Sequence, residues 1–236
     1  LTDPELMQEK FFIPGYDILT GQMENNDMFI GETVTGSDYK AAHKRICRDD
    51  PDVMALPLQA FYDASYVDTF GSLQSSPFIV TPLGVQAKFR HTHDWIIPMG
   101  LVPHLKYGKG KADRELARNK LQDKCNCLAA VLAQLREIYN QGGFWLDVMG
   151  KKRRVIPWIQ FVGGDISGMN SLTGAFNVNG KTARPYRDCM CCFDDLDDPY
   201  AVCQYFTMSQ YRTAKEEGTL KSLSIHHINN AMETIP

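Results

Sequence analysis

Short apolar runs alternate with turn residues over the first half of the chain. Three of them, at 58–63, 77–83 and 94–102, are separated by the stretches FGSLQSS and QAKFRHTH. Runs of this length and spacing are typical of an antiparallel meander. Pro82 and Pro98 cannot donate to a strand ladder, so we expect them at strand ends or on an edge strand.

The segment 111–141 carries the periodicity of a long amphipathic helix. Its apolar stripe consists of Leu121, Cys125, Leu128, Leu132, Leu135 and Tyr139. These residues are three or four positions apart and therefore share one helix face. Gly142 and Gly143 suit a left-handed cap at its end. A helix between strands of one sheet forms a crossover, so we expect the next strand to run parallel to a member of the meander.

The stretch FWLDVMGKKRRVIPW predicts a hairpin around Gly150. Its second strand ends at Asp165, and a helix is expected to begin near Ser167. Gly163 and Gly164 would allow another backbone or a ligand to approach that strand end closely.

These elements predict an α/β fold with a mixed sheet, made of a three-stranded antiparallel meander plus parallel strands, and flanking helices. We divide the chain into a peripheral helical segment (1–54), a core (55–180) and a Cys/His-rich segment that ends in the start of a helix (181–236). In the first segment, Ser37 is a candidate N-cap for a short helix that ends before Pro51.

The composition is that of an ordinary globular protein, with 44% hydrophobic and 22% charged residues. No apolar run approaches the roughly 20 residues of a membrane span, so we expect no membrane partner. The chain begins without Met, and we expect it to be part of a longer protein. Its seven cysteines with no secretory signal favour a reducing, intracellular compartment over a disulfide framework.

The net charge of −3 does not by itself indicate a nucleic-acid partner. Two local basic clusters do exist, and their simplest interpretation is solvated loops. They are Lys106, Lys109 and Lys111, and Lys151, Lys152, Arg153 and Arg154.

Two apolar strands deliver an acid at their carboxyl ends, Asp63 and Asp165. On adjacent parallel strands the two side chains would lie about 5 Å apart, where like charges repel unless a cation lies between them. Carboxylate oxygens suit Mg²⁺ or Mn²⁺, which can serve phosphoryl transfer. The alternative is that both aspartates merely cap loops or helix starts. Asp68 is a nearby competitor for the role of Asp63.

Several stretches together resemble one family of proteins. They are FYDASYVDTFGSL, WIIPMGLVPHL, QGGFWLDVMGKKRRVIPWIQFVGGDISGMNSLTGAF, YRDCMCCFDDLDDPYAVCQY and LKSLSIHHINNAM. Their order is similar to that in the ribonuclease H-like catalytic core of DDE/D transposases. Their amino-acid sequences resemble those of the Kyakuja–Dileera–Zisupton and Plavaka-type transposases. The resemblance covers roughly residues 55–232.

The resemblance implies that Asp63 and Asp165 are the first and second catalytic acids and hold Mg²⁺ or Mn²⁺. The third acid of the family follows an inserted segment, and no convincing match to it precedes Pro236. Glu233 is the last acid of the chain, but in the family its segment precedes the insertion. The resemblance also implies DNA as the partner, a nuclear location and a homo-oligomer as one option.

Four cysteines crowd into the stretch CMCCFDDLDDPYAVC. Cys189 and Cys192 have the two-residue gap that aims two sulfurs at one tetrahedral ion, and Cys203 with His226 or His227 could complete a structural zinc site. The family is similar in carrying a cysteine knuckle after its second acid. Buried free thiols are the alternative, and Cys125 and Cys127 in the long helix are expected to be small buried hydrophobic residues of that kind.

Three functions are compatible with these observations. The first is a transposase-type enzyme that hydrolyses or transfers DNA phosphodiester bonds with two metals, with DNA contacts from Lys151, Lys152, Arg153 and Arg154. The second is a non-catalytic, domesticated DNA- or protein-binding module, and the third is a metal-dependent phosphoesterase on another α/β scaffold. The basic hairpin lies at the start of the strand that ends at Asp165. The four basic residues are therefore expected at the end of the sheet opposite the two aspartates.

Overall fold

A computed structural model describes most of the predicted core. The described residues are 36–48, 50–66, 74–103, 114–148, 150–175 and 207–226, with the shorter pieces 8, 12–13, 16–17, 22–23, 198, 204, 228, 230 and 233. The side chains of residues 16, 17, 22, 23, 66, 114, 115, 117, 166 and 167 are outside this description.

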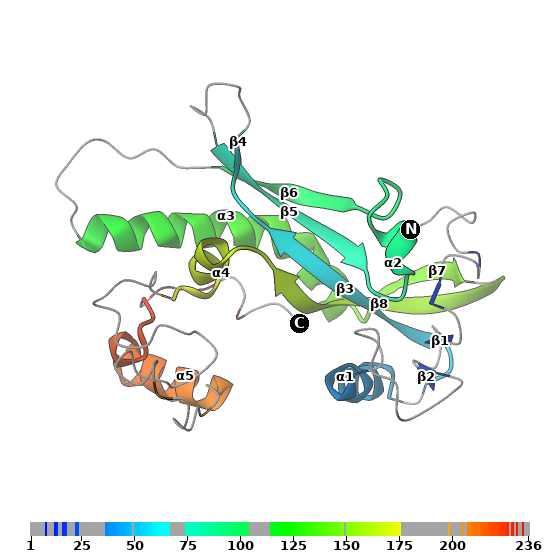
Figure 1. Cartoon of the computed structure of the whole chain (residues 1–236). Coiled ribbons are helices and arrows are strands. Elements are labelled where there is room, and N and C mark those ends of the chain that lie inside the picture. Colours follow the sequence, from blue (N-terminus) through cyan, green and yellow to red (C-terminus); the bar gives the residue numbers. More distant parts are fainter. Residues whose placement is uncertain are drawn as a thin grey trace.

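One mixed sheet organises the described part of the chain (Figure 1). Its strands are β3 (Val53–Tyr62), β4 (Ser65–Tyr66), β5 (Gln74–Pro82), β6 (Ile97–Pro103), β7 (Phe144–Val148) and β8 (Lys151–Gly163). The order across the sheet is β6–β5–β3–β8–β7, and the short β4 pairs with β5 beyond the end of β3. All pairs are antiparallel except β3 with β8, which is parallel. The predicted meander and the predicted parallel strand are therefore confirmed.

Five α-helices and one 3-10 helix accompany the sheet in the described residues. They are α1 (Ser37–Cys47), α2 (Ala87–Arg90), α3 (Arg114–Asn140), α4 (Ile166–Thr173), α5 (Met208–Glu216) and η4 (Leu220–Leu223). A separate two-stranded ladder joins β1 (Tyr16–Asp17) to β2 (Gln22–Met23). Of the helices seen, none is both long and apolar enough to cross a membrane.

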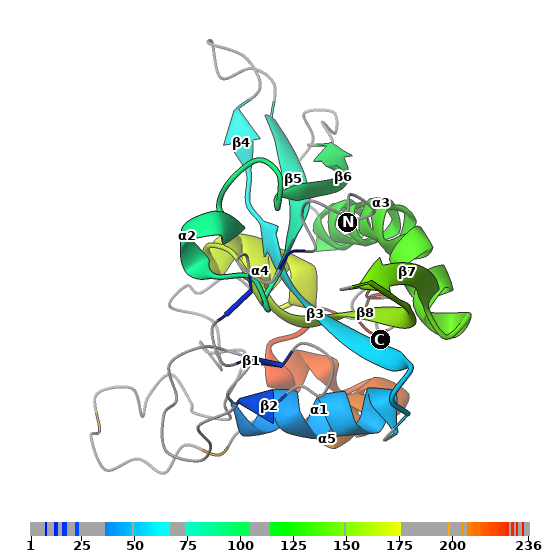
Figure 2. The same cartoon turned by 90° about the vertical axis from the view of Figure 1, so that its right-hand side faces the viewer.

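The long helix α3 covers one face of the sheet (Figure 2). Phe78 lies opposite Tyr62 on β3 and opposite Gly100 on β6, so these three positions share a face. A Cβ on Gly100 would lie only 2.8 Å from a methyl carbon of Val131, which shows how closely α3 approaches this face. The predicted stripe is confirmed, because Cys125, Leu128, Leu132 and Leu135 are buried and Leu121 and Tyr139 are half-buried. The cap is also confirmed, since Gly142 and Gly143 have φ values of 78° and 97°.

Helix α1 packs against the opposite face. Trp158 lies opposite Pro57 in the β3–β8 ladder, so both side chains are on the same face of the sheet. Pro57 is an odd number of residues from Tyr62 along β3, so this face is the one opposite Tyr62 and α3. The ring of Trp158 stacks on Tyr39 of α1 with centroids 6.3 Å apart, and Tyr39 is fully buried. Phe12, Ile13, Tyr39 and Cys47 of segment 1–54 thus belong to the same hydrophobic core as the following segment. The predicted N-cap is displaced by one residue, because Gly36 occupies that position and Ser37 is the first helical residue.

Strand β3 is longer than its apolar pattern suggested, because it runs through a proline. The carbonyl oxygen of Pro57 accepts a hydrogen bond from the Leu83 amide at 2.9 Å, but its nitrogen cannot return the bond to the Leu83 carbonyl. The buried guanidinium of Arg90 donates to that carbonyl at 3.2 Å and also to the Val85 carbonyl at 2.8 and 3.1 Å. A side chain from α2 therefore replaces the donor that the proline lacks.

We predict that Arg90→Met destabilises the fold by roughly 2–3 kcal/mol, because it leaves buried carbonyl oxygens without these donors. The matched control is His91→Ala, the neighbouring exposed residue. Urea unfolding checks this through a lower midpoint with an unchanged slope. Equal midpoints for the two variants would contradict a bridging role for Arg90.

Candidate functional site

The parallel pair β3–β8 brings the two predicted acids to the same end of the sheet. The last aligned pair in the ladder is Phe61 with Gly163. Asp63 and Asp165 each follow two residues later, and neighbouring strands are about 4.8 Å apart. The two aspartates therefore leave adjacent strands at equivalent levels.

An irregularity in the ladder sets this alignment. Leu58 pairs with Ile159, but Gln59 pairs with Phe161, so Gln160 is an extra residue on β8. Without this bulge Asp63 would be level with residue 164 instead of Asp165. Bulges re-aim side chains and are enriched beside active sites. This one brings the two acids level.

Asp63 is half-buried and bonded locally. Its Oδ1 accepts a hydrogen bond from the Ala64 amide at 2.7 Å. Its Oδ2 has no partner within the part of the chain that the structure describes. One oxygen thus fixes the carboxylate while the other is available to a ligand.

Asp165 is exposed and is the N-cap of α4. Its Oδ1 accepts a hydrogen bond from the Gly168 amide, and the first turn is closed by the bond from the Met169 amide to the Asp165 carbonyl at 2.9 Å. Capping satisfies an amide that the helix itself cannot pair. The structural role considered from the sequence is therefore present here, and it uses one oxygen of the two.

Gly164 allows the ends of β3 and β8 to approach each other. A Cβ at this position would lie 2.4 Å from the carbonyl oxygen of Tyr62. The expected close approach is confirmed for Gly164. At Gly163 no part of the described chain approaches in this way, because a Cβ there would meet nothing nearer than 3.8 Å.

Tyr62, which precedes Asp63, is buried at the end of β3. Burial raises the pKa of its hydroxyl, although a hydrogen bond with Ser76 acts in the opposite direction. Its ring lies 6.4 Å from that of Phe78. The carboxyl end of β3 is therefore held by packing on the side that faces α3.

No third acid joins the two aspartates among the described residues. Among these residues, no three His, Cys, Asp or Glu side chains lie close enough together to hold a metal ion. Asp68 lies outside the described residues.

Glu233 does not join the two aspartates, because its carboxylate binds side chains of helix α5. Its carboxylate accepts hydrogen bonds from Lys215 Nζ at 2.8 and 3.0 Å and from the Tyr211 hydroxyl at 2.5 Å. Burial would raise the pKa of Glu233, but the bonds from Lys215 and Tyr211 outweigh it and lower that pKa. Burial and the same carboxylate raise the pKa of Tyr211. Glu233 therefore remains ionised and ties the C-terminal segment to α5.

The predicted basic cluster lies at the far end of β8. This strand has 13 residues, which at about 3.3 Å per residue separate Lys151 from Gly163, two residues before Asp165, by roughly 40 Å. Arg153 is buried and donates to the Pro51 carbonyl, whereas Lys151 and Lys152 are exposed. Arg154 lies 3.8 Å from Asp50. The cluster is therefore distant from the two aspartates, and Arg153 has a structural role.

Most of the predicted zinc ligands, namely Cys189, Cys192, Cys203 and His227, lie outside the described residues. His226 is half-buried, and burial lowers the pKa of its imidazole. Its amide donates to the Gly174 carbonyl at 2.8 Å. The other basic candidates, Lys106, Lys109 and Lys111, also lie outside the described residues.

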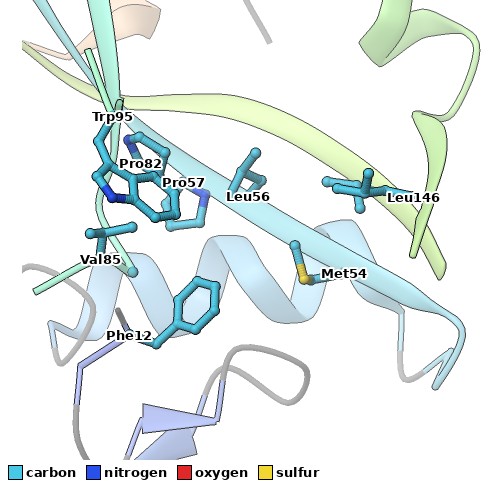
Figure 3. Close-up of a pocket in the computed structure, with 10 residues that line it drawn as sticks. Phe12, Met54, Leu56, Pro57, Pro82, Val85, Trp95 and Leu146 are labelled. Atoms are coloured by element: carbon cyan, nitrogen blue, oxygen red, sulfur yellow. The ribbon is translucent and has the colours of Figure 1, made fainter. Parts of the chain in front are cut away.

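A small cavity under the sheet belongs to the core (Figure 3). Its volume is about 10 Å³ and its lining is apolar, with Phe12 and Trp95 in an edge-to-face contact at 6.4 Å. A space of this size barely holds one water molecule, and an apolar one stays dry. Phe12 thereby anchors part of the N-terminal segment, helped by the bond from the Gln86 side chain to its carbonyl at 2.7 Å.

Sequence reasoning missed a second feature, a groove at the end of the sheet opposite the aspartates. It gathers Arg45, Arg48 and Arg154. The pattern HKRICRDD contains the first two, but Arg154 follows far along the chain and joins them only because β8 begins beside the start of β3.

Comparison with known proteins adds no family assignment. A scan against profiles of known families finds no match. A search of curated proteins finds no significant relative.

We predict that Gly164→Ala destabilises the fold by about 2 kcal/mol or more, because its Cβ would collide with the Tyr62 carbonyl and force the two strand ends apart. Gly163→Ala is the matched control and should change the unfolding free energy by less than about 1 kcal/mol. Chemical denaturation of both variants measures the difference. A Gly164→Ala protein as stable as the Gly163→Ala protein would disprove the close approach of the two strands.

Proposed function

We propose that this chain is the catalytic core, or a remnant of the core, of a DDE/D transposase with a ribonuclease H-like fold. In this proposal Asp63 and Asp165 hold Mg²⁺ or Mn²⁺, and the partner is DNA in the nucleus. The observation that supports it most is the pair of aspartates at the carboxyl ends of the adjacent parallel strands β3 and β8, at the same level of the ladder. The order of meander, crossover helix and parallel strand also agrees with the resemblance noted in the sequence.

The two carboxylates have the chemistry that a hard divalent cation requires. Each has one oxygen bonded to a backbone amide, which fixes its orientation. The second oxygen of each can accept a metal ion, and oxygen ligands are those that Mg²⁺ and Mn²⁺ prefer. Metal ions bound here would polarise a phosphoryl group and activate an attacking oxygen. The protein's part is to hold Asp63 against the buried Tyr62 and Asp165 at the start of α4, so that neither moves when charge develops.

A non-catalytic, domesticated binding module is the second candidate. One observation favours it: both aspartates have local backbone partners, and the described residues supply no third acid beside them. The two candidates differ in one measurable property, which is the affinity of this end of the sheet for a divalent cation.

The decisive experiment is a titration of the purified chain with Mn²⁺, followed by calorimetry. We expect Asp63→Asn and Asp165→Asn each to weaken Mn²⁺ binding by about tenfold or more, because each removes a charged ligand. Asparagine keeps an oxygen for the Ala64 or Gly168 amide, so the fold and the N-cap of α4 should be retained.

Asp147→Asn is the matched control, because Asp147 is an exposed strand residue beside Lys152 at the far end of β8. It should bind Mn²⁺ as the unmodified chain does. If the unmodified chain binds no Mn²⁺, or if all three variants bind it equally, the catalytic proposal fails and the binding module is favoured.

The zinc site is a separate part of the proposal and rests on the sequence alone. We expect about one zinc ion per chain by elemental analysis, released when Cys189 and Cys192 are both replaced by serine. Zinc-free protein of unchanged stability would reduce the cluster to free thiols.

A further inference from the structure

The groove at the end of the sheet opposite the aspartates is rich in guanidinium groups. It has a volume of about 460 Å³ and is lined by Arg45 and Arg48 from α1, Arg154 from β8 and Asp50 from the turn before β3. Arg45, Arg48 and Asp50 are exposed, and Arg154 is half-buried. Three positive charges and one negative charge leave a net charge of +2 on the described lining.

The guanidinium groups retain most of their capacity to donate. Arg154 is 3.8 Å from Asp50, which is too long for a hydrogen bond. The side chains of Arg45 and Arg48 have no hydrogen-bond partner within the described parts of the chain. A guanidinium group offers donors in a fork that matches the oxygens of a phosphate, so converging arginines are suited to that anion.

Arg48 occupies a backbone position that normally favours glycine. It ends α1 with φ 51° and ψ 36°, in the left-handed region. A residue with a Cβ is less stable than glycine there by about 1 kcal/mol. The fold therefore retains the Arg48 side chain at this position despite a backbone preference against it, which points to a role for the side chain itself.

Apolar groups accompany the charges. Ile46, Val53 and Ile156 line the groove together with Tyr139 from the last turn of α3. The volume falls within the range of small-molecule sites, about 300–1,000 Å³, and such sites combine apolar walls with a few placed polar groups. The lining therefore fits an anion that carries an organic body better than it fits a bare ion.

We propose that this groove binds a phosphate ester. Its phosphate lies among Arg45, Arg48 and Arg154, and its organic part lies on Ile46, Val53, Ile156 and Tyr139. The same chemistry is offered by a free nucleotide and by the backbone of a nucleic acid. This site is distinct from the aspartates and does not depend on their binding a metal.

A structural explanation competes with this proposal. The C-terminal end of a helix carries partial negative charge, and basic residues in its last turn offset that charge by about 0.3–1 kcal/mol. Arg45 lies in the last turn of α1 and Arg48 caps it. This explanation does not account for Arg154, which comes from β8. It also predicts a loss of stability when Arg48 is replaced, whereas the backbone preference for glycine acts in the opposite direction.

The test is calorimetric titration of the whole chain with inorganic phosphate, adenosine monophosphate and a short DNA duplex, alongside thermal unfolding. The central variant is Arg48→Gly, with Arg45→Gln and Arg154→Gln as companions. Each should weaken binding of the phosphate ester by about tenfold, because each removes charged donors. Arg48→Gly should also keep or raise the unfolding temperature. Arg118→Gln, an exposed arginine near the start of α3, controls for net charge and should bind normally.

The probes separate the two sources. Tighter binding of adenosine monophosphate than of inorganic phosphate identifies a nucleotide site. Binding of the duplex alone, with a salt slope reduced by about one per replaced arginine, identifies the nucleic-acid backbone. The proposal is overturned if no probe binds, or if all variants bind as the unmodified chain does. Asp63→Asn and Asp165→Asn should leave this binding intact, and Arg48→Gly should leave Mn²⁺ binding intact, so the two sites fail or succeed independently.

Discussion

The parallel pairing of β3 with β8 is the contact on which the other features of this molecule depend. It joins nine residue pairs in one ladder and lies at the centre of the sheet, with β5 and β6 on one side and β7 on the other. A parallel pair requires a long connection that crosses a face of the sheet, and the stretch containing α3 supplies it. One end of the ladder carries Asp63 and Asp165, and the other carries the arginine groove. The pairing register of β3 with β8 therefore determines which residues come together at both candidate sites.

That register includes two departures from a regular ladder, and each has a local consequence. Pro57 lacks an amide donor at the point where β5 ends, and the guanidinium of Arg90 bonds the carbonyl that the proline leaves unpaired. Gln160 is an extra residue in β8, and it shifts the register so that Asp165 is level with Asp63. A sheet this buried cannot leave carbonyl groups without partners at low cost. The break at Pro57 therefore depends on one particular side chain, that of Arg90.

The parts of the fold that were predictable from the sequence are those with a local or periodic signal. The stripe on α3 follows from a spacing of three and four residues, and the hairpin follows from Gly150, a turn residue between the stretches FWLDVM and KKRRVIPW. The parallel direction of β8 follows from the crossover alone. The start of β3 was not predictable in this way, because Pro57 interrupts its pattern and the donor that compensates comes from Arg90, which is distant in sequence.

The same distinction holds for the candidate sites. Asp63 and Asp165 are visible in the sequence because each ends an apolar run, although the sequence does not show that each also bonds a neighbouring amide. The groove is invisible in the sequence, because Arg48 and Arg154 belong to separate elements and only the pairing of the β3 and β8 starts brings them together. Tyr39 differs in part, because it forms a buried stripe on α1 with His43 and Cys47 at a spacing of four residues. The sequence does not show that Trp158 is the residue on which it stacks.

The separation of β3 from β8 along the chain also has a consequence for how the molecule is made. During synthesis the meander β3–β5–β6 and helix α3 leave the ribosome before β8 exists, and the edge of β3 that will receive β8 is then without its partner. Closing so long a loop costs chain entropy before any contact rewards it, so this pairing is a late and slow event. Until it forms, a central, strongly apolar strand has an open edge, which is the condition under which nascent chains aggregate or recruit chaperones.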